Sequence, residues 1–203
     1  MLTLDHFVAA GTSLNIATEW VGNALTELPT GNGKHKYFGT HNDLWGMGPT
    51  CYLETIAIDR TAVNPASARW FGLDNFVGPP RLVGWILATK NIRNTLTQLG
   101  PQFGAPVKLQ RGKYTWEISV TKSGELPFGG YGPALIEWHN GFHPSLDLSD
   151  SKCRLQNLHI QHPDAEIMQS LLGDLINDDR IIFKKGVEKI SAEIKKEQKL
   201  IIL

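Results

Sequence analysis

The sequence TCYLETIAID at residues 50–59 is typical of a buried β-strand with one charge at its centre. Alternate side chains of a strand share a face, which places Glu54 between Tyr52 and Ile56 on one side of a sheet. A carboxylate among apolar neighbours is costly to bury unless it is protonated, hydrogen-bonded, ion-paired or bound to a metal. Glu54 is therefore the first candidate for a functional residue.

The composition is ordinary for a soluble globular protein, with 41% hydrophobic and 20% charged residues among 203. Because 20 basic residues balance 20 acidic ones, the charge gives no indication of a nucleic-acid or membrane partner. No apolar run approaches the roughly 20 residues that span a bilayer, and the N-terminus lacks the pattern of a signal peptide. Cys51 and Cys153 are too few for a disulfide framework. We expect a cytoplasmic location.

The chain repeats an order of expected elements. A strand, a helix and three strands are predicted at 3–10, 14–28, 35–39, 41–47 and 51–59. The pattern restarts after a proline-rich stretch, with elements at 82–89, 92–99, 107–110, 115–121 and 134–139. A third, similar run occupies 154–161, 163–176, 180–184, 189–195 and 199–203. An internal repeat of this kind predicts repeated structural units.

We predict an α+β fold of repeated βαβββ units. The first unit spans 1–62, a linker 63–81, the second unit 82–147 and a third, βαββ(β)-like unit 148–203, all packed into one compact domain. Superposing the units pairs His6 with Trp85 in the opening strands, and Glu54 with Glu137 in the closing strands.

Two such units joined about a pseudo-twofold axis would bring His6, Glu54 and Glu137 to one cavity. One imidazole and two carboxylates suit a divalent cation, Zn²⁺, Fe²⁺, Mn²⁺, Co²⁺ or Ni²⁺, with open positions for water or substrate. Such an ion could polarise a carbonyl and stabilise an enediolate, or hold O₂ beside a catechol.

These motifs resemble those of the vicinal oxygen chelate superfamily (glyoxalases, bleomycin resistance proteins and extradiol dioxygenases), and within it the glyoxalase-like domain proteins. The resemblance rests on LDHFV at 4–8, GTHN at 39–42, YLETIAID at 52–59, RWFGLD at 69–74, GW at 84–85 and IEWH…HP at 136–144, and continues weakly through HPDAE at 162–166. It implies paired βαβββ units that form an open, incompletely closed barrel around a cavity.

The resemblance also implies metal ligands on the opening and closing strands of each half. His6, Glu54 and Glu137 match three ligand positions, and Trp85 stands at the fourth, where an indole cannot bind a metal. His41, beside the first-half strands, is a candidate replacement ligand. The departure at Trp85 bears directly on whether a metal binds at all.

The leading functional hypothesis is a metal-dependent enzyme of the glyoxalase type, a lyase, isomerase or dioxygenase, acting on a small oxygen-bearing substrate. Glu54 and Glu137 are the candidate catalytic residues, since one of them could leave the metal and act as a base. The candidate substrate-binding residues are Tyr52, Trp85, His41, Arg69 and His139. A homodimer is expected, because the last strands offer a free edge and symmetric dimers are common.

Other interpretations stay open. The same cavity without metal could bind a hydrophobic or aromatic small molecule, with Tyr52, Trp45, Trp85 and Trp138 as stacking walls. The chain could instead serve in protein–protein contact, which an exposed apolar patch would indicate. His6 could be a core histidine, Glu54 half of a buried ion pair, Glu137 a structural partner of His139, and Trp85 part of the core.

Overall fold

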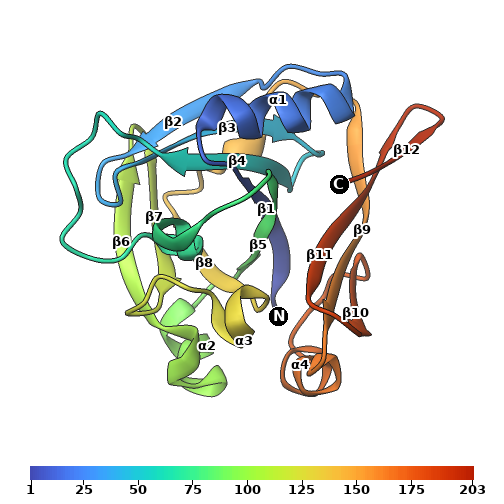
Figure 1. The fold of residues 1–203 in the computed structure, drawn as a ribbon. Coiled ribbons are helices and arrows are strands. Elements are labelled where there is room, and N and C mark those ends of the chain that lie inside the picture. Colours follow the sequence, from blue (N-terminus) through green and yellow to red (C-terminus); the bar gives the residue numbers. More distant parts are fainter.

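The chain folds into two β-sheets, which stand side by side in the computed structural model (Figure 1). The structure describes residues 1–203. The larger sheet has eight strands in the order β2-β3-β4-β1-β5-β8-β7-β6 and curls into a nearly closed barrel, while the smaller has four in the order β10-β9-β11-β12. The predicted α+β fold with paired units around a cavity is confirmed.

The first unit contains β1 (Thr3–Ala10), α1 (Leu14–Leu25), β2 (Gly31–His35), β3 (Thr40–Gly46) and β4 (Tyr52–Ile58). The Ser13 side chain caps α1 by accepting from the Ile16 backbone N–H, and the helix lies on β4 through its buried residues Ala17, Val21 and Leu25. The strand predicted at 35–39 is wrong. The glycine-rich stretch from Gly31 forms β2 instead, because it pairs with β3 along its whole length.

The linker that joins the two units folds back on the barrel. It contains the 3₁₀ segment Trp70–Asn75, in which Trp70, Phe71 and Leu73 are buried. The second unit follows with β5 (Arg81–Ala88), α2 (Ile92–Leu99), the 3₁₀ turn Pro101–Phe103, β6 (Ala105–Arg111), β7 (Tyr114–Val120), α3 (Pro127–Gly130) and β8 (Ala134–His139). A further 3₁₀ turn at Pro144–Leu146 leads out of the barrel.

The two units meet at the middle of the larger sheet. The opening strands β1 and β5 pair antiparallel, and each closing strand lies parallel to its own opening strand, β4 to β1 and β8 to β5. The register between β1 and β5 shifts between Leu4 and His6, so that Asp5 sits in a β-bulge. Bulges redirect side chains and are common beside functional sites.

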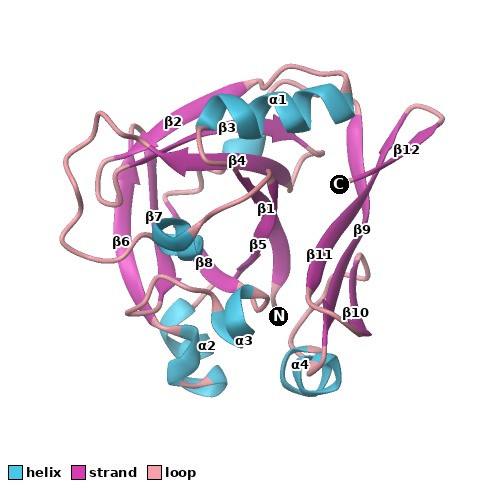
Figure 2. Cartoon of the chain, in the orientation of Figure 1, coloured by secondary structure: helices cyan, strands magenta, loops and turns pink.

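The third unit is β9 (Cys153–His162), α4 (Ala165–Leu172), β10 (Ile181–Lys185), β11 (Lys189–Lys196) and β12 (Lys199–Ile202). Its elements follow the same order as in the other units, but its opening strand β9 lies between β10 and β11. Figure 2 shows its sheet as a separate layer with α4 at one end. None of the helices is long and apolar enough to cross a membrane.

Two cores lie on opposite faces of the larger sheet. Phe7, Trp85 and Leu87 face outward and pack with buried residues of the third unit. Val8, Ile86 and Ile136 face inward and pack with aromatic side chains inside the barrel. Because alternate residues of a strand point to opposite faces, this division decides which predicted site residues reach the interior.

Candidate functional site

The barrel interior holds a small cavity with two kinds of wall. Its lining is His6, His35, Asn42, Tyr52, Glu54, Trp70, Phe71, Arg111, Trp116, Ile118, Ile136 and Trp138. The first unit supplies the histidines, the amide and the carboxylate, whereas the second supplies apolar and aromatic side chains together with one arginine. The space open to the centre of a water molecule is about 20 Å³, room for about one water.

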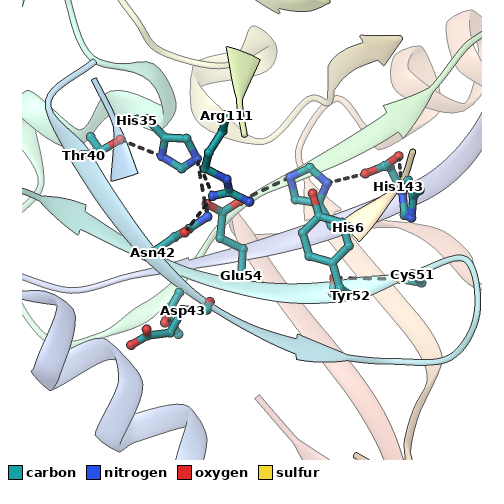
Figure 3. A network of polar contacts seen from close by, with 12 residues as sticks. His6, His35, Thr40, Asn42, Asp43, Cys51, Tyr52, Glu54, Arg111 and His143 are labelled. Atoms are coloured by element: carbon teal, nitrogen blue, oxygen red, sulfur yellow. Dashed lines mark hydrogen bonds and ion pairs between the residues drawn. The ribbon is translucent and has the colours of Figure 1, made fainter. Parts of the chain in front are cut away.

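His6 lies between two buried carboxylates (Figure 3). Its Nδ1 is 2.6 Å from Asp5 Oδ1, its Nε2 is 3.4 Å from Glu54 Oε2, and its ring stacks on Tyr52 with centroids 4.4 Å apart. Burial alone would lower the pKa of His6, but the hydrogen bonds and charges of Asp5 and Glu54 outweigh it and raise that pKa to about 9. At neutral pH His6 is therefore an imidazolium ion.

Asp5 connects His6 to two side chains in and just after β8, Trp138 and His143. Its Oδ2 accepts hydrogen bonds from Trp138 Nε1 at 2.8 Å and pairs with His143 Nε2 at 3.1 Å. Burial would raise the pKa of Asp5, but the contacts with His143 and His6 hold it well below its usual range. Asp5 was not among the predicted site residues, because simple alternation would place it on the face opposite His6. Only the bulge brings both side chains into one network.

Glu54 joins a second branch of hydrogen bonds. Asn42 Nδ2 donates to Glu54 Oε1 at 2.7 Å, and Asn42 Oδ1 accepts from Arg111 Nη1 at 3.1 Å. Burial would raise the pKa of Glu54, but its bonds with His6 and Asn42 keep it below the usual value. The polar partners that a buried carboxylate requires are therefore His6 and Asn42.

Arg111 and His35 complete this branch where the two edge strands of the barrel approach each other. Arg111 stands at the end of β6 and its Nη1 lies 3.4 Å from Nε2 of His35 in β2, while His35 Nδ1 lies 3.1 Å from Thr40 Oγ1. Burial lowers the pKa of His35 to about 4, so this ring is neutral at pH 7 and its Nε2 can accept. Arg111 was not among the predicted site residues, since only closure of the barrel brings it to the first unit.

The structure corrects the placement of Glu137, which does not converge with His6 and Glu54. Glu137 faces outward on β8, where its Oε2 accepts from the Ile92 backbone N–H at the start of α2, at 2.8 Å. Its neighbours Ile136 and Trp138 line the cavity instead. The alignment of the repeats was displaced by one residue, and a one-residue shift moves a side chain to the opposite face.

The structure also corrects the predicted position of Trp85. It faces outward on β5, is fully buried, and donates from Nε1 to the Tyr131 carbonyl at 2.9 Å. The inward residue that pairs with His6 is Ile86. An apolar side chain therefore occupies the matching position of the second unit, and Trp85 belongs to the core.

The other predicted substrate-binding residues divide between cavity and surface. Tyr52 lines the cavity, but His41, Arg69 and His139 do not. Arg69 pairs with Asp74 at 2.6 Å in the linker, and His139 Nε2 lies 3.6 Å from Glu117 Oε2 outside the barrel. Of the predicted stacking walls, Trp138 lines the cavity and Trp45 belongs to the outer core.

The cavity does not gather the donors that a resident metal ion needs. Only His6 and Glu54 among the predicted ligands point into it, and no group of three or more His, Cys, Asp or Glu side chains is placed to hold a metal ion. Catalytic zinc sites have three protein ligands. The positions of the second unit that match His6 and Glu54 are Ile86 and Ile136, which cannot bind a cation.

Two βαβββ units joined through their opening strands, with a polar cavity inside one curled sheet, define a vicinal oxygen chelate protein. The chain belongs to the glyoxalase-like domain family, whose sequence profile matches residues 4–176. The resemblance found in the sequence motifs is confirmed. No curated protein matches the chain in sequence.

Solved structures agree with this fold. A hypothetical protein from Staphylococcus aureus, 14% identical, superposes with a TM-score of 0.67 over 98% of this chain and 92% of its own. A methylmalonyl-CoA epimerase from Mycobacterium tuberculosis, 17% identical, gives a TM-score of 0.42 over 66% of this chain and 85% of its own. Identities this low show the fold alone, and the epimerase likeness is too weak to carry an argument about function.

Proposed function

We propose that this protein binds a small organic molecule with an aromatic or apolar portion inside the barrel, without a resident metal ion. The observation that carries this proposal is that the polar wall is already satisfied: both ring nitrogens of the His6 imidazolium face a carboxylate, Asp5 on one side and Glu54 on the other. The opposite wall, with Trp116, Trp138 and Ile136, suits an aromatic ring.

A donor in the cavity wall supports a ligand with an acceptor group. Trp70 lines the cavity and is 5% exposed, yet its Nε1 has no hydrogen-bond partner in the protein. Buried N–H groups without an acceptor are rare. An oxygen atom of the ligand would satisfy this indole while Arg111 supplies positive charge nearby.

The test is a tryptophan fluorescence titration of chelator-treated protein with 1-naphthoate. Saturable quenching is expected in the wild type. Ile136→Phe fills the cavity and should weaken binding at least tenfold, whereas Leu135→Phe adds the same ring on the outer face of the same strand and should leave affinity within twofold. Absence of saturable quenching in the wild type, or equal loss in both variants, would contradict the proposal.

The second candidate function is a metal-dependent enzyme of the lyase, isomerase or dioxygenase type. It is favoured by one observation: His6 Nδ1 contacts a carboxylate at 2.6 Å while Nε2 points toward Glu54, an arrangement that metal-binding histidines share. His6 and Glu54 would hold the ion, whose binding must displace a proton from the ring. Substrate oxygens would have to supply the remaining donors.

Elemental mass spectrometry of gently purified protein distinguishes the two candidates, with Glu54→Gln measured alongside. Near-stoichiometric Zn, Fe, Mn, Co or Ni in the wild type and its loss in Glu54→Gln would favour the enzyme. No bound metal after loading with each ion would contradict it.

The homodimer stays a prediction. The edge strand β12 exposes Leu200 and Ile202, which supports association through this edge. Light scattering coupled to size-exclusion chromatography would measure the mass, and Ile202→Lys should shift a dimer to monomer. A monomeric wild-type protein would contradict the prediction.

A further inference from the structure

The inner cavity as it stands holds much less than a whole ligand. About 20 Å³ for the centre of a water molecule is room for about one water, so a ring enters only when side chains of the wall move aside. An outer cleft of about 550 Å³ lies between the barrel and the third unit. That volume falls within the range of ordinary small-molecule sites.

The outer cleft has the composition of a ligand site. Trp20, Phe76, Tyr131 and Ile190 give it apolar and aromatic surface. Its charged side chains, Arg81, Lys189, Glu125 and Glu188, balance one another, so the cleft favours neither a cationic nor an anionic occupant. An uncharged apolar or aromatic segment fits this lining best.

One side chain, Phe71, lines both spaces. It packs against Gly84 of β5, where an added Cβ would lie 3.2 Å from Phe71 Cδ1 and 2.9 Å from Leu126 Cδ1. The glycine therefore gives the Phe71 ring room to lie against the strand between the inner cavity and the outer cleft.

The backbone at this wall is held in an unusual conformation. Phe71 and Gly72 have φ angles of 57° and 64°, in the left-handed region that residues other than glycine seldom adopt. The Gly72 N–H donates to the Gly124 carbonyl at 3.0 Å and so joins this turn to the loop whose next residues, Glu125 and Leu126, also line the cleft. Strained residues of this kind concentrate at ligand clamps and switch regions.

We propose that the outer cleft is a second ligand compartment, that Phe71 is the gate between it and the inner cavity, and that both spaces take one amphipathic molecule. Its apolar or aromatic tail lies in the cleft. Its carbonyl or carboxylate head reaches past Phe71 into the inner cavity and accepts a hydrogen bond from the Trp70 indole N–H, which has no partner in the protein. This inference rests on the proposed function and adds the class of ligand and its route.

The test uses two probes on chelator-treated full-length protein: 11-(dansylamino)undecanoate, with a long tail, and 1-naphthoate, with none. Lys189→Trp fills the cleft from an exposed position and should weaken binding of the long probe at least tenfold. Lys195→Trp, exposed on the same strand and outside the cleft, should change it less than twofold. Equal affinities in the two variants would overturn the assignment of the cleft.

Stopped-flow kinetics test the gate. Phe71→Ala should raise both the association and the dissociation rate of the long probe at least tenfold, with a smaller change in Kd, because a gate alters rates in both directions. Phe71→Leu keeps an apolar contact if the alanine variant does not fold, and should raise both rates at least threefold. An unchanged association rate in a folded variant would overturn the gate.

The two probes separate this inference from the proposed function. If 1-naphthoate binds the wild type and the long probe does not, the inner site stands and the two-compartment inference fails. If neither probe binds, the proposed function fails and the inference fails with it.

Discussion

The two βαβββ units of the barrel use the same architecture to present opposite chemistry. In the first unit, His6 of β1 pairs with Tyr52 of β4, and Glu54 follows two residues later. In the second, Ile86 of β5 pairs with Ala134 of β8, and Ile136 follows two residues later. The matching positions are polar on one side and apolar on the other, which shows that a pseudo-symmetric fold need not carry a symmetric site.

The difference changes what each wall can do. In the polar wall, buried charged and polar side chains meet one another's hydrogen-bonding needs; they are Asp5, His6, Glu54 and Asn42. The apolar wall offers surface for a ring but no donor for a cation. Variants that break the polar wall, or move its chemistry to the other unit, therefore test the comparison.

The largest expected effect comes from Asp5→Asn. The amide takes one of two carboxylates from the buried His6 ion, and it cannot accept at both of its ends, so a buried donor among His6 and Trp138 loses its acceptor; the free energy of unfolding should fall by about 3–5 kcal/mol. Asp147→Asn, which removes an exposed carboxylate that contacts Lys113 and Tyr114, is the control and should cost much less than Asp5→Asn. Urea denaturation measures both, and similar losses in the two variants would contradict a buried network.

Ile136→Glu moves a carboxylate to the apolar wall at the position that matches Glu54. In chelator the variant should lose about 2–4 kcal/mol, because the new charge is buried without a partner. With His6 and Glu54 it would make a third metal ligand, so Zn²⁺ at 100 times its Kd should restore about 3 kcal/mol. Ile136→Gln, neutral and similar in size, should show no recovery with Zn²⁺; recovery in both would contradict the account of the missing ligand.

The pH dependence of stability should separate the two buried histidines. The folded-state pKa of His6, about 9, lies above its unfolded value of 6.5, so its stabilisation is complete below pH 6.5 and is lost as the pH rises through 9. The folded-state pKa of His35, about 4, lies below 6.5, so its contribution is present above pH 6.5 and is lost as the pH falls through 4.

Denaturation between pH 6 and 10 measures the first of these effects. The wild type should lose about 3 kcal/mol across that range from His6 alone. In His6→Gln this decline should disappear while His35 still acts below pH 6.5. An identical alkaline decline in wild type and variant would show that His6 is not the group responsible.

Arg111→Met should have the smallest effect of these changes. It removes the hydrogen bond to Asn42 at the edge of the barrel, and we expect a loss of about 1–2 kcal/mol. Arg93→Met, which removes an exposed contact with Glu117, should cost less than about 0.5 kcal/mol. Thermal unfolding of both variants measures the difference.

The sequence predicted the repeated units and the first-unit residues, because β4 carries a charge in an otherwise apolar strand. It did not determine on which face of the sheet the side chains of Trp85 and Glu137 lie. Strands β5 and β8 are apolar on both faces over most of their length, so no alternation decides which side chains point inward. Aligning the two units by their hydrophobic pattern can therefore shift one unit by one residue, and nothing in the sequence reveals the shift.

Asp5 and Arg111 were missed for other physical reasons. A β-bulge depends on how two strands pair, which the local sequence around Asp5 does not specify. Arg111 reaches Asn42 across 69 residues of chain, because the curled sheet brings its two edges together. Such closure is a property of the whole fold and leaves no local pattern.

The most direct test of a metal-free polar wall is the protonation state of His6, read from the ring-nitrogen NMR shifts of ¹⁵N-histidine protein at pH 7. We predict that both ring nitrogens of His6 carry protons in chelator-treated protein and stay protonated when equimolar Zn²⁺ is added. A ring nitrogen that is unprotonated at pH 7 would contradict this prediction, and the loss of a ring proton on addition of Zn²⁺ would identify His6 as a metal ligand.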